Sequence, residues 1–137
     1  MVADTTRVFV VAPTGRDHVV AYYAWTMAQL AIPDAPARLR KGAGRYPQPV
    51  ALLARLGVHL EHERKGLGAA LLRDVIQRAA AISDDIGCCG LLVHAESEGA
   101  VDFYRHLVPE FEPSPTDELH LVLLLQDIRR TLQAPHR

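Results

Sequence analysis

The chain has 137 residues, a hydrophobic fraction of 49% and a formal net charge of −1 at pH 7, which suits one globular domain. Its apolar runs are much shorter than a membrane span, and the N-terminal stretch MVADTTRVFVV lacks the order of a signal peptide. We therefore expect a cytoplasmic protein with no membrane partner. The near-neutral charge gives no overall sign of nucleic-acid binding, so any polyanion site must be a local cluster.

The first half of the chain predicts three strands. Residues 7–12 and 18–30 are rich in β-branched and aromatic residues on either side of a PTGRD turn, which is typical of an antiparallel hairpin. Residues 31–49 carry several prolines and glycines and predict a surface loop with one helical turn around 37–41. The nearly continuous apolar run at 50–60 predicts a central strand covered on both faces.

The second half alternates helices and strands. Apolar residues recur at spacings of three and four from Gly66 to Gly87, which indicates a long amphipathic helix. A buried strand is expected at 90–95, and Ser97 followed by a glutamate predicts the start of a short helix over 97–107. The C-terminal pattern predicts strands or strand pieces at 110–115 and 118–125 and a short helix at 126–132.

The strand-to-helix turn at 60–68 is the clearest functional signal. Gly66 and Gly68 precede the long helix, where free backbone N–H groups and the positive end of the helix dipole favour a phosphate. Arg64 and Lys65 add positive charge. The alternative is that the glycines only form the turn. A nucleoside-triphosphate loop is excluded because Ala69 follows where a lysine is needed, and a dinucleotide fingerprint lacks its third glycine.

Three stretches together resemble the GNAT superfamily of acetyl-CoA-dependent N-acetyltransferases: LLARLGVHLEHERKGLGAALLRD, IGCCGLLVHAESEGAVDFYRHL and FEPSP. The superfamily phosphate loop reads Gln/Arg-x-x-Gly-x-Gly/Ala, and residues 63–68 match both glycines but begin with Glu63. The resemblance implies an α/β (α+β) fold. In it, a single GNAT-like domain over 1–137 has a mixed central sheet, flanking helices and a parallel strand pair that splays at the acetyl-CoA site.

Within that superfamily, ARLGV, VHAESEGAVDFY and FEPSP look like the acetyltransferase toxins of bacterial type II toxin–antitoxin systems. The resemblance implies acetylation of the α-amine of aminoacyl-tRNA, which blocks translation, and a ribbon-helix-helix antitoxin as partner. Such toxins usually begin with an extra amphipathic helix before the first strand; this sequence starts almost directly at TRVFVV, so we expect that helix to be missing here. Two alternatives stay open: an enzyme acting on a small amine or a protein N-terminus, and an impaired module that binds only CoA or an antitoxin. A homodimer is compatible with the sequence.

The resemblance also implies roles for individual residues. Tyr104 takes the position of the general acid that protonates the CoA thiolate, whereas the residues alone favour a tyrosine packed beside Phe103. A backbone N–H near Val58 would hold the thioester oxygen, and Gly57 would mark a bulge where the strands part. The residues expected to bind acetyl-CoA are Leu56, Gly57, Val58, Arg64, Lys65, Gly66, Leu67, Gly68 and Ala69.

Several other polar residues suggest RNA binding or metal binding by their type alone. Arg38, Arg40, Lys41 and Arg45 form the one basic cluster, either an RNA contact or a solvated face. No side chain stands out as a general base, and this favours an α-amine acceptor because its pKa of about 7.7–8.0 lies below the pKa of lysine. No metal site is expected: His59 and His62 lie at a strand end, and the H-x-E at 94–96 lacks the cysteines of zinc deaminases. The adjacent cysteines, Cys88 and Cys89, are expected to be reduced and mostly buried.

Overall fold

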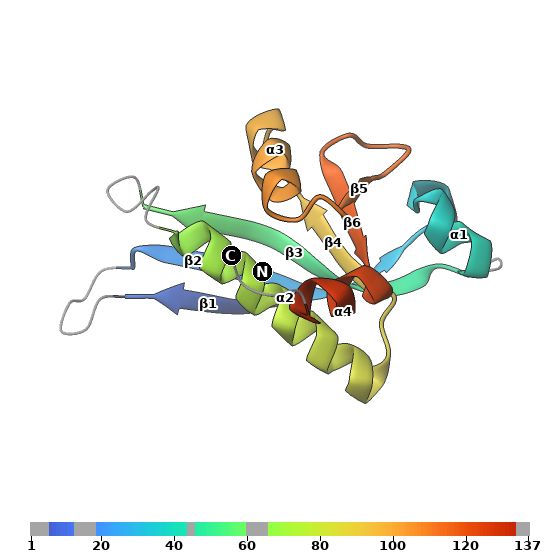
Figure 1. The fold of residues 1–137 in the computed structure, drawn as a ribbon, viewed down its shortest axis with the longest axis horizontal. Helices are drawn as coiled ribbons and strands as arrows, with labels where there is room; N and C mark the ends of the chain where they lie inside the picture. Colours follow the sequence, from blue (N-terminus) through green and yellow to red (C-terminus); the bar gives the residue numbers. More distant parts are fainter. Residues whose placement is uncertain (1–5, 13–18, 44–45, 60–65, 134–137) are drawn as a thin grey trace.

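The computed structural model describes residues 6–12, 19–43, 46–59 and 66–133. These residues form a six-stranded mixed sheet in the order β1-β2-β3-β4-β6-β5 (Figure 1). The strands are β1 (Arg7–Val11), β2 (Ala21–Leu30), β3 (Gln48–Val58), β4 (Gly90–His94), β5 (Glu112–Pro113) and β6 (His120–Leu124). The helices are a short 3-10 turn (Ile32–Asp34), α1 (Ala37–Ala43), α2 (Leu67–Ile86), α3 (Glu98–Leu107) and α4 (Leu125–Gln133).

The N-terminal hairpin and the central strand are confirmed. β1 pairs antiparallel with β2, and β2 pairs antiparallel with β3 along the whole of its length. The β2–β3 register shifts between Ala24 and Trp25, which lie opposite Arg55 and Leu53, so Ala54 is the extra residue of a bulge. The expectation of a bulge at Gly57 was wrong, because Gly57 lies in regular register opposite Tyr22.

The long helix α2 connects β3 to β4, which runs parallel to it. The parallel ladder comprises three residue pairs, from Ala51 with Leu91 to Leu53 with Val93. β3 continues for five residues beyond its last pair, to Val58, whereas β4 ends one residue beyond, at His94. The two central strands therefore part at their C-terminal ends, as the resemblance to the GNAT superfamily implies.

The two faces of the sheet are covered differently. A large core joins α2, Tyr104 of α3 and Ile128 of α4 to the sheet face that carries Leu53 and Val93. On this face, α2 and α4 lie side by side (Figure 1). A smaller core on the opposite face holds Leu39 of α1 against β3, β4 and β6; its members are Leu30, Ala35, Leu39, Val50, Leu92, Val122 and Leu124.

The segment 31–49 is more ordered than the predicted loop with one helical turn. It contains the 3-10 turn and the seven-residue helix α1, and β3 begins within it at Gln48. α1 forms because Leu39 is buried against the sheet, at 9% exposure, and because the backbone N–H groups of Leu39 and Arg40 both bond to the carbonyl of Pro36. Tertiary burial thus overrides the local turn signals here.

A polar network ties α2 to the hairpin. The hydroxyl of Tyr23 on β2 donates a 2.5 Å hydrogen bond to Asp74 of α2, and Arg78 Nε donates to the same carboxylate oxygen at 2.9 Å. The Arg78 guanidinium lies 4.1 Å from the ring centroid of Phe9 on β1. These contacts fix the orientation of α2 and hence the position of its N-terminus.

Cys88 is buried, Cys89 is half-buried, and both thiols are free, as the sequence predicts. Among the helices of the described residues, none combines the length and the apolar character that crossing a membrane requires.

Candidate active site

The parting of β3 and β4 leaves one edge of β3 open. Among the described residues, no strand pairs with that edge beyond Leu53. His59 donates its backbone N–H to Val20 on the β2 side, and backbone groups alternate in direction along an antiparallel strand, so those of Leu56 and Val58 point to the open side. An extended amide-bearing ligand can add to such an edge as an extra strand.

Gly57 lies under an aromatic ring. A Cβ built on Gly57 would lie 2.6 Å from Cε1 of Tyr22, its cross-strand partner on β2. A side chain at this position would push the ring aside, so the glycine lets Tyr22 lie flat across the end of β3.

The N-terminus of α2 is built to present free amides. Gly66 caps the helix in the left-handed conformation (φ 81°), and a Cβ there would meet nothing within 4 Å, so its backbone angle and not space calls for glycine. Within the described residues, no side chain caps this end, and the first turn carries no acidic residue. Its N–H groups and the helix dipole are therefore available to an anion. Arg64 and Lys65 lie outside the described residues.

Gly68 lies where α2, α3 and β3 meet. A Cβ on Gly68 would lie 3.0 Å from Cζ of Phe103 and 3.8 Å from Cγ2 of Val58. The structure thus brings the predicted phosphate turn, the open end of β3 and the helix of Tyr104 into contact. Leu67, also predicted to bind acetyl-CoA, packs partly buried against the large core.

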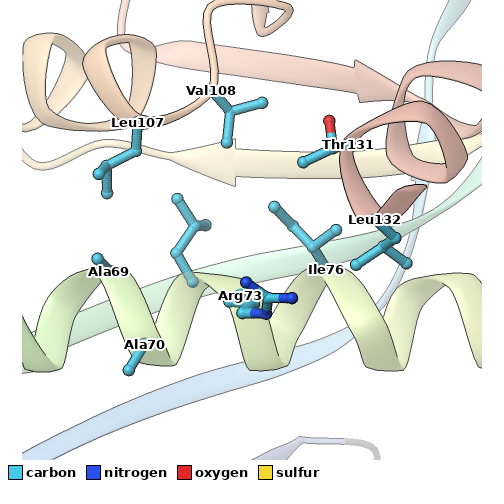
Figure 2. A pocket seen from close by; sticks show the side chains of 9 residues that line it. Ala69, Ala70, Arg73, Ile76, Leu107, Val108, Thr131 and Leu132 are labelled. Carbon is cyan, nitrogen blue, oxygen red and sulfur yellow. The ribbon is translucent and has the colours of Figure 1, made fainter. Parts of the chain in front are cut away.

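A pocket of about 330 Å³ begins beside Ala69 and lies between α2, the end of α3 and α4 (Figure 2). Its walls are largely apolar, with the Arg73 side chain at one wall and Thr131 opposite, on α4. Ala69, which lines this pocket, is also one of the residues expected to bind acetyl-CoA. The lining residues are Ala69, Ala70, Leu72, Arg73, Ile76, Leu107, Val108, Thr131 and Leu132.

Tyr104 is buried, at 5% exposure, with its ring in edge contact with Phe103 and Phe111. Burial, with a smaller contribution from the negative charge of Glu96, raises the pKa of Tyr104 to about 12. The phenol is therefore fully protonated at neutral pH and is a hydrogen-bond donor. Among the residues that the structure describes, none forms a hydrogen bond with this hydroxyl, so the proton is available to a ligand.

The predicted basic cluster divides into two kinds of residue. Arg38 Nη1 bonds to the buried carboxylate of Asp127 at 2.9 Å and lies 3.5 Å from Glu112, which raises the pKa of the guanidinium and fastens α1 to α4 and β5. Arg40 and Lys41 are exposed on α1. Arg45 lies outside the described residues. Arg38 is thus held by carboxylates, whereas Arg40 and Lys41 face solvent.

A histidine pair at the parting was missed by the sequence reasoning. His94 at the end of β4 stacks on its cross-strand partner His120 of β6, with ring centroids 4.0 Å apart. His120 Nε2 lies 3.3 Å from Asp117 Oδ2. The two rings are 26 positions apart in the chain, and only the β4–β6 register brings them together. Within the described residues, no three side chains are grouped as metal ligands; His62 lies outside this part.

The comparisons with known proteins decide the family. The model of the acetyltransferase (GNAT) family matches residues 3–107, which include the phosphate turn, both parting strands and Tyr104. The chain belongs to this family. A tRNA-acetylating toxin of Mycobacterium tuberculosis is 45% identical over 124 residues, covering 90% of the chain and 72% of that protein.

Solved GNAT structures share the fold. The chain superposes on AtaT complexed with acetyl-methionyl-tRNAfMet with a TM-score of 0.83 and 23% identity, over 94% of this chain and 76% of that one. It also superposes on a tyrosine-to-phenylalanine mutant of the AtaT toxin bound to the C-terminus of the antitoxin AtaR and acetyl-CoA, with a TM-score of 0.68 and 23% identity. That match covers 85% of this chain and 67% of the other. The mixed sheet with its parting parallel pair is therefore a GNAT sheet, as the sequence predicts.

Proposed function

We propose that residues 1–137 form one acetyltransferase domain that transfers the acetyl group of acetyl-CoA to the α-amine of an aminoacyl-tRNA. Such a reaction blocks translation and makes the protein a toxin. The observation that carries the proposal is the 45% identity, over 90% of the chain, with a tRNA-acetylating toxin. The open β3 edge, the uncapped α2 N-terminus and the buried tyrosine support it, because they lie together.

The acetyl donor fits the site in three parts. The amide-bearing pantetheine arm lies along the open edge of β3, where the backbone N–H of Val58 points toward the thioester oxygen. The pyrophosphate lies against the first turn of α2, which Gly66 begins in the left-handed conformation and where Gly68 carries no side chain. Donors fixed at the thioester oxygen stabilise the negative charge that develops there during acyl transfer.

Tyr104 serves the leaving group. As the thioester C–S bond breaks, the thiolate needs a proton or a hydrogen bond, and the protonated phenol of Tyr104 supplies it. Phe103 lies over Gly68 and precedes Tyr104 on the same helix, so the phosphate turn and the acid are positioned by one contact. The apolar surroundings of the Tyr104 ring keep water away from the acid.

The tRNA is recognised through its phosphates on the side of α1. Arg40 and Lys41 are exposed there and suit phosphate contacts, together with Arg45. Arg38 holds α1 in place through Asp127 and is not itself assigned to RNA. The mycobacterial relative is a tRNA-acetylating toxin, and AtaT has been solved in complex with acetyl-methionyl-tRNAfMet. A cytoplasmic location and a ribbon-helix-helix antitoxin complete the proposal.

The test is acetyl transfer from labelled acetyl-CoA to charged tRNA, with uncharged tRNA, polyamines and peptides with free N-termini as competing acceptors. We expect label on the aminoacyl group of charged tRNA and none on uncharged tRNA. Preferential labelling of a polyamine or a peptide would replace the proposal by a small-amine or N-terminal acetyltransferase. Binding of acetyl-CoA without transfer to any acceptor would indicate an impaired binding module.

A further inference from the structure

The parting of β3 and β4 opens to both faces of the sheet. Tyr104 lies on the α2 face, in the large core with Leu91 and Val93 of β4. Leu92 belongs to the smaller core on the α1 face, and side chains alternate along a strand, so His94 projects on the α1 face. His94 is also the first residue of β4 beyond the last parallel pair, that of Leu53 with Val93.

His94 is held by a chain of contacts. Its ring is nearly parallel to that of His120, with an interplanar angle of 12° and a centroid separation of 4.0 Å. His120 Nε2 lies 3.3 Å from Asp117 Oδ2, while Asp117 Oδ1 accepts the backbone N–H of Leu119 at 2.9 Å. The hydrogen bond from Leu119 therefore holds the Asp117 carboxylate in place. Asp117 orients the His120 ring, and the His120 ring stacks on that of His94.

The surroundings of His94 keep it neutral. Burial and the neighbouring His120 lower the pKa of His94, and Asp117 opposes them with a smaller effect. Arg55 of β3 lies on the same face of the sheet, since it pairs with Ala24. Among the described residues, none hydrogen-bonds with either ring nitrogen of His94. A half-buried neutral imidazole with a free nitrogen therefore lies at the parting.

We propose that His94 is the general base of the acetyl transfer, with His120 and Asp117 as positioning residues. The inference rests on the proposed function. The acceptor amine attacks the thioester carbon, forming the C–N bond, and its surplus proton passes to the His94 imidazole, directly or through one water. The C–S bond then breaks, and Tyr104 provides the proton of the thiol. Base and acid thus act from opposite faces of one sheet. Once CoA and the acetylated product have left, solvent takes the proton from His94 and returns one to Tyr104.

The experiment compares His94→Gln with wild type in transfer to charged tRNA. We expect kcat to fall about 10²-fold, with the affinity for acetyl-CoA unchanged. We also expect the slope of the acid limb of the kcat/KM profile, below the ordinary histidine pKa of about 6.5, to fall from about two to about one in the variant, because the acceptor α-amine still titrates there and His94 no longer does. Added imidazole should restore part of the turnover in His94→Ala. His106→Gln, which changes an exposed histidine of α3, is the matched control and should behave as wild type.

Failure of this inference is separable from failure of the proposed function. Wild-type activity on charged tRNA together with unchanged kcat and pH profile in His94→Gln would overturn the base and leave the function intact. If wild type acetylates no charged tRNA, the proposed function fails, and the same variants are then compared on the amine that it does acetylate. A folded His94→Ala variant that imidazole does not rescue would reduce His94 to a structural role and overturn the proposal.

Discussion

Gly68 and Phe103 touch across the two helices of the active site: a Cβ on Gly68 would lie 3.0 Å from Cζ of the Phe103 ring. This distance is tighter than ordinary van der Waals contact, so any side chain at 68 displaces the ring. Phe103 precedes Tyr104 on α3, and Val58 at the end of β3 lies against the same glycine. The absence of a side chain at Gly68 therefore allows the phosphate turn, the thioester-binding end of β3 and the helix that carries Tyr104 to lie in contact.

Gly68→Asp should weaken the binding of acetyl-CoA. The substitution places a carboxylate at the proposed pyrophosphate position and pushes against Phe103, which adds charge repulsion to a steric clash. We expect affinity to fall at least tenfold, about 1.4 kcal/mol, by calorimetry. Ala81→Asp, which adds the same charge to an exposed position of α2, should leave affinity unchanged. Equal affinities for acetyl-CoA in the two folded variants would contradict the assignment of the pyrophosphate site to this turn.

Gly66→Ala should act through the backbone. Gly66 has φ 81° and open space around it, so the cost is the strain of a left-handed alanine, about 1 kcal/mol of unfolding free energy. Relief of that strain would rotate the first turn of α2 and reduce acetyl-CoA affinity as well. The matched exchange Gly99→Ala, in α3 and without a positive φ, should stabilise the protein slightly. Chemical denaturation of both variants measures the difference, and an equal response would contradict the assignment.

Arg38→Ala should destabilise the fold, unlike Arg40→Ala. Removing the Arg38 guanidinium takes away the 2.9 Å partner of Asp127, which is 1% exposed, and leaves the longer 3.6 Å contact from Arg130. A buried carboxylate that loses its better partner is costly. We expect the thermal midpoint to fall by several degrees in Arg38→Ala and to stay within about one degree in Arg40→Ala, since exposed substitutions have small effects. Equal midpoints would mean that α1 does not depend on this ion pair.

Neutralising Arg40 and Lys41 together should affect tRNA and not the acetyl donor. If they contact phosphates, each lost contact removes about one unit from the slope of log affinity against log salt. We therefore expect weaker binding of charged tRNA, a shallower salt slope and unchanged affinity for acetyl-CoA in Arg40→Gln/Lys41→Gln. An unaltered salt slope would indicate that Arg40 and Lys41 only form a solvated helix face and do not contact RNA.

The parts of the site that the sequence predicts are those with local signals. Periodicity and a serine cap place α2 and α3, and Ser97 indeed accepts the Ala100 backbone N–H at 3.2 Å. The glycine turn predicts the uncapped N-terminus of α2 because backbone angle and helix direction are local properties. The positions of Leu56, Val58 and Tyr104 relative to that turn follow from the resemblance to the GNAT family, whose fold the chain shares.

The parts that the sequence does not predict depend on contacts between distant residues. Arg38 belongs to a basic cluster in sequence, and its partner Asp127 is 89 positions away. The bulge at Ala54 arises from the β2–β3 register and not from a glycine. His94 and His120 become neighbours only when β6 pairs with β4, and no local pattern specifies that pairing. Register and burial, which are set by the whole sheet, decide each of these three cases.

Tyr104→Phe tests the role of a single proton. The ring contacts with Phe103 and Phe111 remain, so the variant should fold and bind acetyl-CoA as wild type does. Turnover with charged tRNA should fall by roughly 10²–10⁴, the usual contribution of a positioned acid, and toxicity in cells should disappear with it. A loss confined to acetyl-CoA affinity would make Tyr104 a cofactor contact. Full turnover would show that the thiolate leaves unassisted or takes its proton from water, because no other change in the site accompanies the loss of this hydroxyl.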